Sequence, residues 1–100
     1  MDLEDIIDQL NKREQRATYG AVAGIVDVIP RALMAGRPRG YKNSWVVAKR
    51  SSSRGARAGW PTGYADSQIH PECLRQIRTG DGKPIQDSES LRRWLAVKVR

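Results

Sequence analysis

Apolar residues near the N-terminus recur at helical spacing and predict an amphipathic helix. The stripe consists of Leu3, Ile6, Ile7 and Leu10. Acidic residues occupy the first turns of this segment and basic residues its end, an order that the helix dipole favours. Residues 2–16 are therefore predicted to form a helix that packs against one side of the core.

Two short helices separated by a turn are predicted next. Thr18 suits the N-cap of a helix over residues 19–26, although the small and β-branched residues there would also fit a strand. We favour a helix because small side chains allow two helices to approach closely, as a helix-turn-helix requires. Pro30 suits the first position of a third helix over residues 30–35, with Gly36 as its stop.

The middle of the chain predicts a loop, a strand and a flexible hairpin. Proline and glycine mark residues 37–42 as a loop, and residues 44–49 (SWVVAK) favour a strand. Residues 49–59 are rich in Ser, Gly and Arg and predict a flexible hairpin tip, before a return strand over residues 60–64 that ends in a turn. The order helix, turn, helix, strand and hairpin is that of a winged helix-turn-helix.

The C-terminal third predicts two more helical segments. Residues 66–76 should form a turn and a helix, and residues 79–84 a loop. Asp87 or Ser88 should cap a last helix, and residues 97–100 should fray. The predicted fold class is thus α+β: the whole 100-residue chain forms one small winged helix-turn-helix domain with an N-terminal packing helix and a C-terminal helical segment.

Aromatic residues are interleaved with basic ones in the middle of the chain. Such aromatics can stack on unpaired bases in a positive groove. The chain has no Phe, so its Trp and Tyr residues must also supply much of the core. Trp45 and Trp94 are expected in the core, whereas Trp60 and Tyr64 could serve either purpose.

The distribution of charge along the chain indicates the kind of partner that the protein binds. The net charge is +7 and the pI is about 10.2. Residues 31–57 contain eight basic residues and no acidic one, whereas five of the seven charged residues in 1–14 are acidic. This segregation predicts a positive face for polyanions, with nucleic acid as the first candidate and an anionic membrane as the second. An ordinary solvated surface is the alternative.

The cysteine and histidine content limits the chemistry. Cys73 is the one cysteine, which excludes an internal disulfide and a thiolate zinc site and fits a reducing cytosol, so we expect a cytoplasmic protein. His70 lies three residues away, but two ligands do not complete a zinc site. We expect no metal and no cofactor, and a buried structural Cys73 with a surface or capping His70. No apolar run is long enough for a membrane span, and no secretory signal is present.

Several short motifs resemble one protein family. Residues 18–23 (TYGAVA) resemble the TYG-x-VA motif that opens the helix-turn-helix of the O6-alkylguanine-DNA alkyltransferases and the alkyltransferase-like proteins. Residues 30–32 (PRA) lie where that family has a Pro, a small-residue run and a base-flipping Arg. Residues 42–47 (KNSWVV) lie where it has PCHRVV, or PWHRV in the alkyltransferase-like branch, and residues 93–95 (RWL) resemble its final helix.

The resemblance implies a winged helix that binds duplex DNA, inserts into the minor groove, flips a nucleotide and recognises modified or damaged bases. It also implies that Tyr19 contacts the phosphate of the target nucleotide; packing of Tyr19 on the wing is the alternative. Asn43 stands where the alkyltransferases have their nucleophilic Cys, and Ser44 where they have His. A thiolate nucleophile needs both the sulfur and a base, so we expect no alkyl transfer.

The predicted function is non-enzymatic binding of double-stranded DNA by a monomer, without a membrane partner. Two alternatives remain: a basic module that binds RNA or an acidic protein, and an enzyme that uses Cys73. Arg31 is assigned to a groove, and the other basic residues to phosphates. The predicted DNA-binding residues are Thr18, Tyr19, Arg31, Arg37, Arg39, Lys42, Asn43, Arg50, Arg54 and Arg57.

Overall fold

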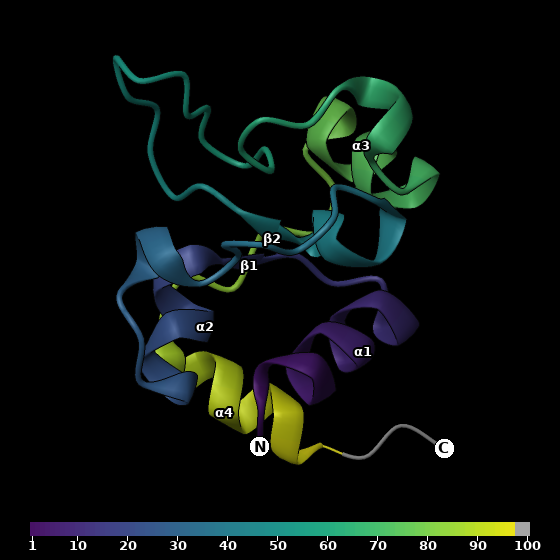
Figure 1. Ribbon diagram of the computed structural model, residues 1–100. Coiled ribbons are helices and arrows are strands. Elements are labelled where there is room, and N and C mark those ends of the chain that lie inside the picture. Colours follow the sequence, from purple (N-terminus) through teal and green to yellow (C-terminus); the bar gives the residue numbers. More distant parts are fainter. Residues whose placement is uncertain (98–100) are drawn as a thin grey trace.

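Four α-helices, three short 3-10 helices and a two-stranded parallel sheet make up the described part of the chain, residues 1–97 of a computed structural model (Figure 1). The predicted α+β class is therefore confirmed. The α-helices are α1 (Leu3–Arg13), α2 (Tyr19–Val26), α3 (Pro71–Thr79) and α4 (Ser88–Ala96). The strands are β1 (Ala17–Thr18) and β2 (Val46–Val47), and the 3-10 helices are η1 (Pro30–Ala32), η2 (Tyr41–Trp45) and η3 (Asp66–Gln68).

The short sheet separates two groups of elements. Figure 1 shows α1, α2 and α4 on one side of β1 and β2, with α3 and residues 49–59, which we call the basic loop, on the other. Ala17 pairs with Val46 and Thr18 with Val47. On its other edge β1 exchanges backbone hydrogen bonds with Ile85, so β1 is bonded on both sides. None of the helices within residues 1–97 has the length and hydropathy that a bilayer crossing needs.

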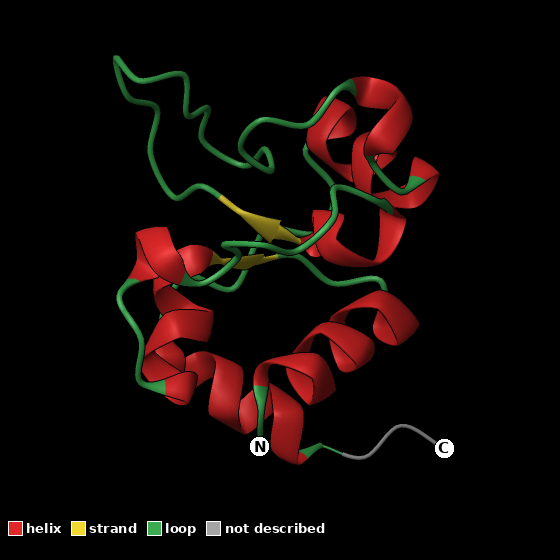
Figure 2. Ribbon diagram, in the orientation of Figure 1, coloured by secondary structure: helices red, strands yellow, loops and turns green. Residues whose placement is uncertain are grey.

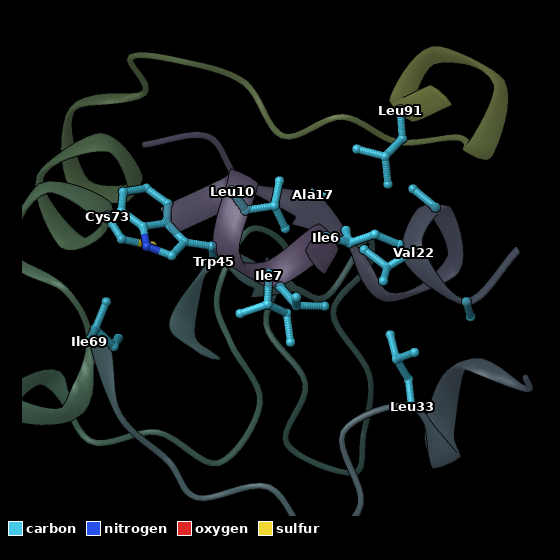
Figure 3. Packing of buried hydrophobic residues seen from close by; sticks show 13 residues of the cluster. Ile6, Ile7, Leu10, Ala17, Val22, Leu33, Trp45, Ile69, Cys73 and Leu91 are labelled. Atoms are coloured by element: carbon cyan, nitrogen blue, oxygen red, sulfur yellow. The ribbon is translucent and has the colours of Figure 1, made fainter. Parts of the chain in front are cut away.

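The core joins α1, α2 and α4 to the sheet, and it also includes Ile69 and Cys73 from the α3 side (Figure 3). Ile6, Ile7 and Leu10 of α1 are fully buried, which confirms the predicted apolar stripe. Trp45 is also fully buried, as predicted, and its indole N–H donates to Asn11 Oδ1 at 2.9 Å. Trp94, which was also predicted for the core, is only half-buried and packs against the core from outside. The guanidinium of Arg13 lies over its ring, 3.5 Å from the centroid.

Helix starts were predicted correctly where a side chain caps them. The Thr18 hydroxyl accepts from the N–H of Ala21, which confirms the predicted helix over residues 19–26. Asp87 accepts from the N–H of Ser90 at the start of α4. The predicted end of the first helix at residue 16 is wrong, because Glu14 adopts a left-handed conformation with φ 54°.

The predicted hairpin is wrong in its strands. Only Val46 and Val47 of the predicted strand are extended in the sheet, because the preceding residues form η2. The expected return strand over residues 60–64 is a series of turns, and the basic loop before it has no strand (Figure 2). Gly59 and Gly63 have φ of +84° and +80°, and Pro61 lacks an N–H, so a regular ladder cannot form there.

Two further helices also differ in extent from their predictions. The third helix shortens to the single 3-10 turn η1 and is continued by turns up to Gly36. The segment predicted as a turn and helix over residues 66–76 consists of η3 and α3, and α3 continues to Thr79. Of the tail predicted to fray, residues 98–100 lie outside the described part of the chain.

Candidate nucleic-acid interface

Tyr19 stands at the junction of α2 with the turns that follow the basic loop. Its ring is half-buried, and its hydroxyl oxygen accepts from the backbone N–H of Thr62 at 2.9 Å. This bond fixes residues 60–64 against the start of α2. Because the oxygen is the acceptor, the O–H proton of Tyr19 remains able to donate to another group.

A cavity of about 490 Å³ opens on one side of Tyr19, and we call it the first cavity. Its charged lining residues are Arg37 and Arg39, and no acidic residue lines it. Tyr64 also contributes: burial raises the pKa of its phenol, and the neighbouring Tyr19 acts in the same direction. Tyr64 is thus protonated at neutral pH and can donate a hydrogen bond. The cavity offers cations, phenols and an apolar wall to one bound group.

Arg39 is placed in this cavity by the conformation of Gly63. Gly63 has φ +80°, a left-handed conformation that side chains disfavour. A Cβ at this position would also come within 2.9 Å of Arg39 Nη2. The absence of a side chain at Gly63 therefore lets the Arg39 guanidinium lie against the backbone beside Tyr64.

A second cavity of about 560 Å³ opens on the other side of Tyr19. It lies between η1 and the basic loop, and its wall is largely apolar. Its two charged lining residues are Arg31 and Lys49, both exposed. The two cavities share Tyr19, Met34, Ala35 and Thr62, so they are neighbours on one face of the molecule.

Arg37 and Lys42 are bound to carboxylates of α1. Arg37 Nη2 lies 2.5 Å from Glu4 Oε2, and the Lys42 ammonium contacts both Glu4 and Asp8. Hydrogen bonds from Lys42 and then Arg37 lower the pKa of Glu4 to about 2. Asp8 and then Glu4 raise the pKa of Lys42. These two cations must therefore leave, or share, an ion pair before they can contact a phosphate.

Two of the predicted DNA-binding residues have structural roles. Asn43 is 6% exposed, and its side chain accepts from Arg37 Nε and donates to the carbonyl of Pro38. Thr18 is 1% exposed and is the cap of α2. Neither side chain faces the cavities, whereas the polar bonds of Asn43 hold the loop that carries Arg37 and Arg39 in place.

The remaining predicted cations are exposed. Arg50, Arg54 and Arg57 lie in the basic loop, and the Arg57 guanidinium lies 4.0 Å from the centroid of the Trp60 ring. Within the described residues, no carboxylate forms an ion pair with the following cations: Arg31, Arg39, Lys49, Arg50, Arg54 and Arg57. The structure thus divides the basic stretch into neutralised and available charges.

Cys73 and His70 occupy positions of low reactivity. Cys73 is fully buried, and burial raises the pKa of its thiol to about 11. His70 caps α3 by accepting from the N–H of Glu72 at Nδ1, as the sequence suggested. No group of three or more potential metal ligands occurs among residues 1–97.

Sequence reasoning missed the residues that shape the cavities from the C-terminal side. Thr62 and Gly63 were expected in a return strand, and Lys49, where the predicted strand meets the hairpin tip, was not among the predicted DNA-binding residues. The available signal was the spacing of Gly59, Pro61 and Gly63, which indicates turns.

Comparison of the chain with protein-family models, with curated proteins and with solved structures finds no match.

Proposed function

We propose that this chain is a non-enzymatic binder of double-stranded DNA. In this proposal α2 and η1 correspond to the helix-turn-helix, and residues 49–59 to the wing of a winged helix. The observation that carries it is the pair of cavities beside Tyr19, whose charged lining residues are all cationic. Three of these cations, Arg31, Arg39 and Lys49, have no carboxylate partner among residues 1–97 and are available to neutralise phosphates and release counterions.

The duplex would lie across the face that holds both cavities. Arg31 at η1 would approach a groove, and the exposed arginines of the basic loop would contact phosphates on either side. The proton of the Tyr19 hydroxyl would donate to a phosphate oxygen near the target nucleotide. The role of Tyr19 follows from the resemblance to the alkyltransferase family. The roles of the cations are supported by their positions.

The first cavity would accept a modified base that has been turned out of the duplex. Its volume is within the range of about 300–1,000 Å³ that is usual for small-ligand sites. Arg39 and the Tyr64 phenol would donate to the oxygen or nitrogen atoms of such a base. Alkyl transfer is not part of the proposal, because Asn43 has no nucleophilic sulfur and the Cys73 thiol is buried and protonated.

Fluorescence anisotropy tests this proposal with labelled duplexes that contain either guanine or O6-methylguanine at one position. Arg39→Ala should weaken binding and erase any preference for the modified base. The matched control is Arg92→Ala, which removes one exposed cation from α4, a helix on the opposite side of the sheet from the basic loop (Figure 1). Absence of salt-dependent binding by the unaltered protein would exclude the proposal.

A basic module for RNA or an acidic protein is the second candidate. The feature that favours a protein partner is the exposed pair Val28 and Ile29, which are 45% and 58% exposed immediately before Pro30. Competition between duplex RNA and labelled duplex DNA decides between RNA and DNA as the partner. Duplex RNA that displaces labelled DNA at equal concentration would favour the RNA module, whereas a persistent preference for duplex DNA would favour the first proposal.

A further inference from the structure

The second cavity has features that the base pocket proposed above does not use. Apolar groups from three parts of the chain form most of its wall: Pro30 and Met34 from the η1 region, Ala48 beside β2, and Ala56 from the basic loop. Its volume of about 560 Å³ is sufficient for a planar base together with its sugar. An apolar wall of this kind favours a flat, weakly hydrated group over a free inorganic anion.

The charge at the rim of the second cavity selects an anionic occupant. Arg31 stands on the η1 side and Lys49 on the side of the basic loop. Among residues 1–97, no acidic residue lines the cavity. The rim is therefore complementary to one phosphodiester group.

The surroundings of the cavity indicate a polymer rather than a single small molecule. The loop that supplies Lys49 and Ala56 also carries the exposed Arg50 and Arg54. Cations in succession follow a chain of phosphates better than they match one isolated anion. The shared wall at Tyr19 places this cavity directly beside the first one.

We propose that the second cavity binds an unstacked nucleotide next to the base held in the first cavity. The base would lie on Met34 and Ala48, and its phosphate between Arg31 and Lys49. This inference rests on the proposed function, because it requires that the face binds nucleic acid. It adds a second nucleotide subsite and predicts a preference for strands in which a base is already unpaired.

Gly20 provides a way to fill the second cavity without disturbing the core. It is exposed on α2, lines the second cavity and not the first, and a Cβ built on it meets no atom within 4 Å. Gly20→Leu therefore places a side chain in the mouth of the cavity. The matched control is Gly40→Leu, because Gly40 also has open space around its Cα, has φ −157°, and lines neither cavity.

The experiment compares a fully paired duplex with a duplex that carries one unpaired 2-aminopurine, by anisotropy and 2-aminopurine fluorescence. The unaltered protein and Gly40→Leu should bind the bulged duplex about tenfold more tightly, a typical effect of holding one base. Gly20→Leu should bind the two duplexes equally. If Gly20→Leu does not fold by circular dichroism, Ala56→Leu fills the cavity from the opposite wall.

The outcomes separate this inference from the proposed function. No binding to either duplex by the unaltered protein would overturn both. Equal binding to the paired and bulged duplexes would overturn the second subsite alone. A third outcome is that Arg39→Ala loses the preference for the bulged duplex while Gly20→Leu keeps it. This result would place the unpaired base in the first cavity, and it would also overturn the second subsite.

Discussion

At the scale of single residues, Arg16 shows how burial changes the role of a charged side chain. It was expected among the basic residues at the end of the first helix, and it is only 4% exposed. Its guanidinium donates to the carbonyls of Gly59 and Gly82 at 3.1 and 2.9 Å. Arg16 thus connects β1 to the end of the basic loop and to the loop before α4. No pattern in the sequence distinguishes this arginine from the exposed ones.

Arg16→Met should lower the free energy of unfolding by about 2–3 kcal/mol, because two partly buried carbonyls lose hydrogen bonds from a charged donor. Urea unfolding measured by circular dichroism is the appropriate assay. Arg78→Met serves as the control, since Arg78 is exposed and its ion pair with Asp66 lies at the surface. An equal loss in both variants would contradict the role assigned to Arg16.

At the scale of elements, the helices were more predictable than the segment that forms the cavities. Caps such as Thr18 and Asp87, and the apolar stripe of α1, act locally, so the sequence predicts them directly. The turns at Gly59 and Gly63 depend on positive φ values and on contacts with Arg16 and Arg39, which lie far away in sequence. The sequence therefore predicted cations of the candidate site but not the shape of its cavities.

The contact between α1 and the loop of Arg37 and Lys42 predicts a pH dependence. The pKa of Glu4 is lowered to about 2 in the folded protein. Its ion pairs therefore contribute stability above about pH 4.5, and this contribution is lost as the pH falls from 4.5 towards 2. Glu4→Gln should be less stable than the unaltered protein at pH 7, and the difference should disappear near pH 2.

Thermal unfolding at both pH values measures this effect. Glu89→Gln is the control, since Glu89 is exposed on α4 and pairs with Arg93. Glu4→Gln should also bind duplex DNA more tightly at pH 7 under the proposed function, because Arg37 and Lys42 lose a competing carboxylate. A stability difference that is unchanged at pH 2 would contradict the account of the ion pairs.

At the scale of the whole molecule, the charge of +7 is less informative than its arrangement. Several cations are neutralised on the surface by nearby carboxylates, as Arg75 is by Glu72 and Asp81. The cations of η1 and the basic loop have no such partners among residues 1–97. Two of them, Arg31 and Lys49, line the second cavity, and Arg39 lines the first. The cations without carboxylate partners thus define one positively charged face of the molecule.

The most direct test of this face is a titration of the ¹⁵N-labelled protein with a short DNA duplex, followed by NMR through the backbone amide shifts. The account predicts large shifts at Tyr19, Arg39 and Lys49, which line the cavities, and at Gly63 beside Arg39. Small shifts are expected at Arg78 on α3. Shifts concentrated on α3 or α4, or no shifts at low salt, would contradict the assignment of this face to nucleic acid.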